Sequence, residues 1–184
     1  KEGVHLKPVV DFWILELKKA LEKKYPAIKF PEKKFKAIST IDVDNLYAYK
    51  SKGVLRTVGA YARDLLKFDF KNLGMRSQVL IGKQKDPFDI YETVSDFCFE
   101  QRIPLIYFFL FRTGTKHDRT VDPSTGAYKE VFNTLKRNHA LFGLHPSYDS
   151  AYEKGMLSNE MKELSSRSGE TINLSRQHYL RFDI

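Results

Sequence analysis

Two aspartates that lie two residues apart are the first candidates for chemistry in this chain. Residues 40–45 read Thr-Ile-Asp-Val-Asp-Asn and contain Asp42 and Asp44. At this spacing, two side chains point to the same face of a strand. Neighbouring carboxylates repel each other, and a metal ion removes that repulsion, with one aspartate as its ligand and the other left as a base. The alternative is a pair of loop aspartates that cap the next turn, and this segment alone does not decide between the two.

A histidine follows the short apolar segment 140–144. It is His145, and Asp149 lies four residues further on, where one turn of chain can bring its carboxylate back to the same centre. A neutral imidazole together with carboxylates suits Zn, Ni, Fe or Co. A single histidine at a strand end is more often a hydrogen-bonded structural residue, but the aspartate pair favours a metal site. We therefore predict a divalent metal ion, Zn before Ni, Co or Fe.

A third polar cluster lies near the end of the chain, where residues 175–179 read Ser-Arg-Gln-His-Tyr. Arg176 and His178 share one face of a predicted strand. An arginine at an inward-facing position needs a carboxylate partner because it cannot lose its charge. Asp42 is the obvious candidate, so we expect an Asp42–Arg176 ion pair. The alternative is an edge strand with both side chains in solvent.

Hydrophobic periodicity gives the elements that must position these residues. The alternation of helices and strands predicts a parallel sheet with helices outside it, either open and doubly wound or closed as a barrel. Ligand sites in such folds lie at the carboxyl ends of the strands, where the three clusters fall. The predicted helices are 9–24, 54–68, 90–101, 129–138 and 152–165, and the predicted strands are 35–43, 104–111, 140–144 and 171–182.

Several parts of this assignment carry further expectations. The segment 71–85 is ambiguous between a helix and a loop. Helix 90–101 follows Asp-Pro and should be capped by a nearby aspartate. The polar loop 112–127 is not a P-loop, but it follows a buried strand and could line the cleft. Four strands are few for a closed barrel, and the last one runs to the end of the chain, so we expect an incomplete domain.

Composition excludes several classes of protein. The chain has 184 residues, 42% of them hydrophobic, which is enough for one folded domain with a core. The single cysteine, Cys98, excludes a disulfide framework and a cysteine-based zinc cluster. No run approaches the ~20 apolar residues of a membrane span. No signal peptide is visible, and the chain opens on Lys1, so cytoplasmic and cell-envelope locations both stay open.

The net charge of +8 raises the question of a polyanionic partner. The lysines gather near the start of the chain, where a solvated helix face explains them. Basic residues are not interleaved with aromatic ones in the manner of nucleic-acid-binding motifs, so no nucleic acid is expected as a partner. A basic nucleic-acid-binding module would instead bind duplex or single-stranded nucleic acid with an affinity that depends on the salt concentration.

Taken together, the three clusters resemble the polysaccharide deacetylases of the NodB-homology class, carbohydrate esterase family four. The family's Thr-Phe-Asp-Asp-Gly motif resembles residues 40–45, and its second, histidine-containing motif resembles residues 145–149. Its Arg-x-Pro-Tyr motif resembles residues 176–179, with His178 in place of proline. The likeness is greatest to a bacterial subgroup with Asp-Val-Asp in the first motif and Gly-Leu-His-Pro-Ser-Tyr in the second. It covers most of the chain from residue 34 onward.

The resemblance implies the family's irregular (β/α) barrel over residues 34–184, incomplete here, preceded by a helix and connection over 1–33. It implies metal-dependent removal of N- or O-acetyl groups from a polysaccharide or glycan precursor. Asp42, oriented by Arg176, would be the base. The metal ligands would be Asp44, His145 and Asp149, where Asp149 stands in place of the family's second histidine; His178 is the alternative third ligand.

Two further side chains, Ser147 and Tyr179, could contact the metal or the substrate in such a site. The family's general acid, a histidine of a later motif, would lie beyond residue 184. A second hypothesis from another class is a catalytically silent domain of the same fold that binds carbohydrate or a partner protein. Turnover of acetylated sugar oligomers distinguishes it from an enzyme.

Overall fold

The computed structural model of the protein describes residues 7–32, 34–112 and 115–180. The chain divides into two compact units, Lys1–Lys36 and Ala37–Ile184, close to the predicted boundary after residue 33. The first unit contains helix α1, Val9–Lys24, with the predicted bounds. None of the residues of α1 is buried, and most of its apolar side chains, among them Trp13, are exposed.

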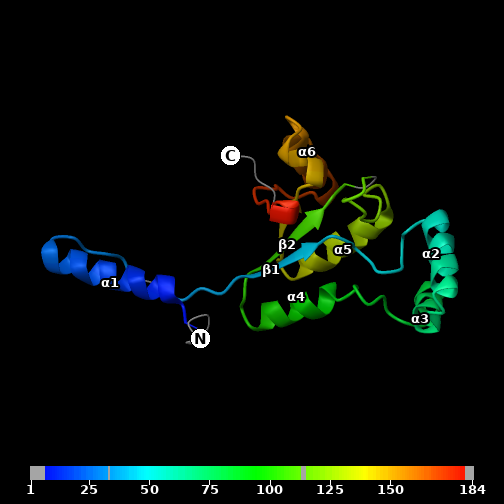
Figure 1. Ribbon diagram of the computed structural model, residues 1–184, viewed down its shortest axis with the longest axis horizontal. Coiled ribbons are helices and arrows are strands. Elements are labelled where there is room, and N and C mark those ends of the chain that lie inside the picture. Colours follow the sequence, from blue (N-terminus) through cyan, green and yellow to red (C-terminus); the bar gives the residue numbers. More distant parts are fainter. Residues whose placement is uncertain (1–6, 33, 113–114, 181–184) are drawn as a thin grey trace. The chain divides into compact units, whose positions relative to one another are not determined.

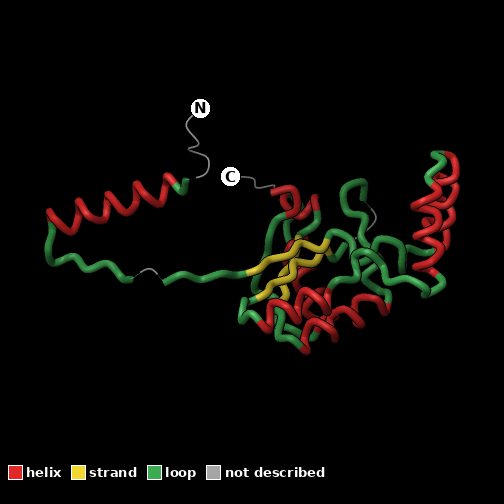
Figure 2. The backbone as a smooth tube through the Cα atoms, turned by 90° about the horizontal axis from the view of Figure 1, so that it is seen from below, coloured by secondary structure: helices red, strands yellow, loops and turns green. Residues whose placement is uncertain are grey.

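The second unit is built on a small parallel sheet, which confirms the predicted α/β class (Figure 1). Its strands are β1, Ser39–Val43; β2, Leu105–Leu110; and β3, Leu141–His145, in the order β1-β2-β3. The three strands run side by side in the tube view (Figure 2). The described residues form this three-stranded sheet and no closed barrel.

One face of the sheet carries the hydrophobic core. Successive side chains of a strand alternate between faces, and the registered rows on this side are aromatic or aliphatic. Helices α4, Tyr91–Glu100, and α5, Gly126–Arg137, contribute the other side of the core. The central residue is Phe109, which is fully buried and makes edge-to-face contacts with the rings of Phe132 and Phe142.

The opposite face of the sheet carries the polar residues of the site. Asp42, Phe108 and Gly143 form one registered row across the three strands. Gly143 makes room for the neighbouring ring, because a Cβ atom there would lie 2.5 Å from Cδ1 and Cε1 of Phe108. The next row on this face ends at His145, opposite Leu110.

Gly143→Ala is expected to destabilise the protein by roughly 1–3 kcal/mol, because the added methyl group must displace the Phe108 ring or the strand. Urea unfolding measures the effect. Gly74→Ala is the control: nothing lies within 4 Å of its Cβ position, and alanine is the better helix former, so it should be neutral or stabilising by up to about 1 kcal/mol. Equal stability of Gly143→Ala and the parent would contradict this packing.

Two helices follow the first strand and form a hairpin of their own. They are α2, Val54–Leu66, and α3, Phe70–Leu80, which resolves the ambiguous segment 71–85 as a helix with an end turn. Asp69 caps α3 by accepting a hydrogen bond from Asn72 N. Large apolar side chains of α2 lie in solvent: Leu55 is 89% and Leu66 80% exposed.

A buried ion pair joins the two helices of this hairpin. Arg76 Nη2 of α3 lies 2.6 Å from Asp64 Oδ2 of α2, and both side chains are nearly inaccessible. Hydrogen bonds from Arg76 and Arg63 outweigh the effect of burial and lower the pKa of Asp64. The charges compensate each other, which is the condition for keeping them in the interior.

The expected cap of the fourth helix is absent. The residue before α4, Ile90, makes no side-chain capping bond, and no aspartate caps it. Asp86 instead accepts hydrogen bonds from the backbone N–H groups of Ala48, Tyr49 and Lys50. Burial disfavours its charge, yet these donors and Phe88 N together lower the pKa of Asp86. The aspartate therefore fixes the loop that follows β1, which is the loop next to the candidate site.

The end of the chain departs most from the prediction. The predicted strand 171–182 is wrong: only Ser175 pairs with the sheet, as an isolated bridge to Leu144, and His178–Leu180 form a short 3-10 helix, η3. Tyr179 has a φ of 60°, which a strand does not allow. The last residues of that prediction lie outside the described part of the chain.

The predicted helix 152–165 is shifted along the chain. It is α6, Met156–Ser168, and it begins after Gly155, whose φ is 84°. A short 3-10 helix, η2, spans Tyr148–Ala151 before it. Among the described residues, no helix is both long and apolar enough to cross a membrane.

Candidate metal centre

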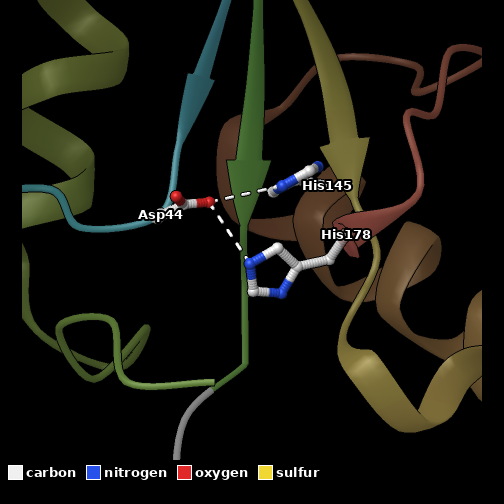
Figure 3. Close-up of side chains that lie close together, drawn as sticks. All are labelled: Asp44, His145 and His178. Carbon is white, nitrogen blue, oxygen red and sulfur yellow. Dashed lines mark ion pairs between the residues drawn. The ribbon is translucent and has the colours of Figure 1, made fainter. Parts of the chain in front are cut away.

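Three side chains from distant parts of the sequence converge at the carboxyl end of the sheet (Figure 3). They are Asp44, His145 and His178, and one ligand atom of each lies within 4.8 Å of the others. Asp44 Oδ1 lies 3.3 Å from His145 Nε2 and 3.6 Å from His178 Nε2. Both imidazoles are buried, whereas the Asp44 side chain is 58% exposed. The cluster is therefore open to solvent on the side of the aspartate.

The sheet and the C-terminal segment place these residues. Asp44 directly follows β1, and His145 is the last residue of β3. His178 comes from the segment that pairs once with β3: Leu144 N donates to Leu174 O, and Arg176 N donates to Leu144 O. The chain then turns at η3, which brings His178 over the end of the sheet.

Both imidazoles are oriented by hydrogen bonds at Nδ1. His145 Nδ1 lies 2.5 Å from the carbonyl oxygen of Arg176, which can only accept, so a neutral His145 carries its hydrogen on Nδ1 and a lone pair on Nε2. His178 Nδ1 lies 3.3 Å from Asp118 Oδ1. Metal-binding histidines are held in this way by a carbonyl or a carboxylate. The arrangement presents both Nε2 atoms to the same point beside Asp44.

Asp118 is a further residue of the candidate site that the sequence did not reveal. Its side chain is fully buried and accepts hydrogen bonds from Thr115 Oγ1 at 2.7 Å and Tyr148 N at 3.0 Å, besides its contact with His178. The available signal was weak: a Thr-x-x-Asp sequence in a polar loop after a buried strand. That loop was expected to line the cleft, but no residue of it was expected to orient a ligand.

Asp118→Asn is expected to weaken zinc binding by roughly 10–100-fold, because an amide holds the His178 ring less well than a carboxylate does. Competition with a chromogenic chelator measures the affinity. Asp122→Asn is the matched control, since Asp122 belongs to the same loop and its carboxylate accepts from Ser124 N, away from the imidazoles. If a folded Asp118→Asn protein binds zinc as tightly as the parent, Asp118 does not support the site.

The electrostatics of the cluster favour a positive charge between Asp44 and His145. The hydrogen bond from His145 is the main cause that lowers the pKa of Asp44. Burial of the imidazole opposes its protonation, but the Asp44 hydrogen bond, the Arg176 carbonyl and the nearby carboxylates together raise the pKa of His145. The site thus attracts a cation, either a proton or a metal ion.

Three other predicted site residues lie outside this cluster. Asp149 lies in η2, and its carboxylate is not part of the group around Asp44. Ser147 is fully buried and bonds Glu160 through both its hydroxyl and its N–H, so it holds α6 rather than facing the imidazoles. Tyr179 is 61% exposed, and its ring lies against those of Tyr148 and His178.

The predicted Asp42–Arg176 ion pair is confirmed. Arg176 Nη1 lies 3.0 Å from Asp42 Oδ1, and Nη2 donates to Thr40 Oγ1 at 2.9 Å. The guanidinium also lies over the Phe108 ring, 4.6 Å from its centroid. Both charged side chains are about one-third exposed, so the pair orients Asp42 more than it stabilises the fold.

The donor set fits a transition metal. One carboxylate oxygen and two imidazole nitrogens are ligands that Zn and its neighbours accept, and three protein ligands are typical of catalytic rather than structural zinc sites. The described geometry favours His178 over Asp149 as the third ligand. The chain matches no family model, no curated protein and no solved structure. The chemistry of the site must therefore be inferred from its own residues.

Proposed function

We propose that the protein is a metal-dependent deacetylase that removes N- or O-acetyl groups from a polysaccharide or glycan precursor. The observation that carries the proposal is the Asp-His-His cluster on the same face of the sheet as the ion-paired Asp42. The resemblance of residues 40–45, 145–149 and 176–179 to polysaccharide deacetylase motifs supports the same reaction.

The two aspartates have different surroundings, which supports different roles. Asp44 faces the imidazoles of His145 and His178 and suits a metal ligand. Asp42 Oδ1 accepts from Arg176, whose guanidinium also donates to Thr40, and the other carboxylate oxygen is kept for other partners, which suits a base. This division follows from their alternate positions, because both project from one face but lie two residues apart along it.

Asp44, His145 and His178 would hold a divalent ion, which would supply Lewis acidity at this end of the sheet. Asp42 accepts the proton of the attacking water as general base. Arg176 orients the Asp42 carboxylate by donating to Oδ1, and Thr40 holds the guanidinium by accepting from its other terminal nitrogen. Hydrolysis then yields acetate and the free amine or hydroxyl of the sugar.

Acetate release tests this proposal. The full-length protein, loaded with zinc, is incubated with acetylated chito-oligosaccharides and with a wider panel of acetylated glycans. We expect acetate from at least one substrate, and its loss on chelation with recovery on adding zinc. Absence of release from every substrate would favour the alternative of a silent domain that binds carbohydrate or a partner.

A further inference from the structure

A basic cavity adjoins the candidate metal centre. Its volume is about 730 Å³, within the usual range for small-molecule sites, and it lies between the α2–α3 hairpin and the loops after β1 and β2. Among the described residues that line it, only Asp118 is acidic. The basic residues that line it are Lys52, Arg56, Arg63, Arg76 and Arg119.

Two of these cations have neutral partners only. Lys52 Nζ donates to Asn45 Oδ1 at 2.6 Å, and the Arg56 guanidinium donates to the carbonyl oxygens of Thr120 at 3.1 Å and Arg119 at 2.9 Å. Within the described part of the chain, neither lies at ion-pair distance from a carboxylate. Both retain unused N–H donors, since an ammonium has three and a guanidinium five.

The nearby carboxylates are committed elsewhere. Asp64 is paired with Arg76 and Arg63. Asp118 is fully buried and is used by Thr115, Tyr148 and His178. Burial, followed by the charge of Arg56, lowers the pKa of Lys52 to about 8, and the charge of Asp86 only partly opposes this shift. An anion in the cavity would supply the missing compensation.

The cavity is connected to the metal centre through two residues. Lys52 bonds Asn45, the neighbour of Asp44 in the sequence. Asp118 lines the cavity and also holds His178. A ligand that fills the cavity therefore reaches the edge of the cluster where hydrolysis is proposed.

We propose that this cavity binds a phosphate group carried by the acetylated sugar, so that the substrate is a phosphorylated N- or O-acetyl sugar. The inference rests on the proposed deacetylase function. A phosphate offers several oxygens to donors that come from different sides, here the loop before α2, α2 itself and the loop before α5. Arginine binds such groups through its planar fork and lysine as a point charge, and the cavity presents both.

Calorimetric titration of the full-length protein, before and after removal of metal, tests the inference. The probes are N-acetylglucosamine, its 1-phosphate and 6-phosphate, and inorganic phosphate. At least one sugar phosphate should bind about tenfold more tightly than the neutral sugar, with and without metal, as expected for a charge-assisted hydrogen bond. Lys52→Gln with Arg119→Gln should abolish that preference and leave zinc binding unchanged.

Lys67→Gln with Lys71→Gln is the matched control, because it removes the same charge from exposed positions outside the cavity. If Lys52→Gln disturbs its loop, Arg119→Gln alone should still weaken sugar-phosphate binding severalfold, since Arg119 is exposed. Equal binding by parent and cavity variant, or equal loss in the control, would overturn the inference. The inference would also be overturned if inorganic phosphate bound as tightly as either sugar phosphate. The titration measures ligand binding and not acetate release, so its result does not depend on the result of the test of the deacetylase proposal.

Discussion

Asp44→Ala and His178→Ala should each weaken zinc binding by more than roughly 10–100-fold, which is the loss expected when a residue that only orients a metal ligand is removed. The larger loss is expected because each of these variants removes a ligand atom from the cluster. Asp149→Ala should bind zinc like the parent, since its carboxylate lies outside the group. Equilibrium dialysis with metal analysis measures all three variants against the parent, and circular dichroism checks that each is folded.

The comparison of His178 with Asp149 decides which residue is the third ligand. The sequence left both open, and the resemblance placed Asp149 at the position of the family's second histidine. If Asp149→Ala loses zinc while His178→Ala retains it, the cluster around Asp44 is not the metal site. If neither Asp44→Ala nor His178→Ala loses zinc, the ion binds elsewhere.

Asp42→Asn is expected to lower the rate of deacetylation by ~10²–10⁴-fold while zinc occupancy stays near that of the parent. Asparagine keeps the shape of the side chain and can still accept from Arg176, but it cannot take a proton from water. Acetate release and zinc content are measured on the same preparation, so that loss of the base is separated from loss of the metal.

Asp149→Asn is the matched control for this variant, because it also replaces one carboxylate near the end of β3 but touches neither cluster nor ion pair. It should retain the parent's rate. Full activity in Asp42→Asn would remove Asp42 from the mechanism. Loss of zinc together with activity in Asp42→Asn would show that Asp42 is a ligand rather than a base.

The regular elements of the fold could be predicted because their patterns are local. Helix α1 has the predicted bounds, and β2 is the continuous apolar run expected of a buried strand. The prediction of a C-terminal strand was wrong for a physical reason: Ile172 and Leu174 alternate with polar residues as in a strand, but the chain leaves the sheet after Ser175 and turns at Tyr179. Tertiary contacts of His178 override the local pattern there.

The candidate site was only partly predictable for a similar reason. Asp42, Asp44 and His145 carry recognisable spacing at strand ends, and the ion pair of Asp42 follows from the need of an inward arginine for a partner. Asp118 could not be found, because its role depends on contact with His178, sixty residues later in the chain. Proximity in the sequence suggested Asp149 as the third ligand, whereas the structure places the distant His178 beside Asp44 and His145.

Anomalous diffraction at the zinc absorption edge, from crystals equilibrated with zinc, tests the metal centre most directly. The geometry predicts one strong peak bound by Asp44 Oδ1 and by the Nε2 atoms of His145 and His178, at about 2.0–2.2 Å from each. The contrary result is a zinc ion held by Asp149 or by surface residues, with Asp44, His145 and His178 left without metal at saturating zinc.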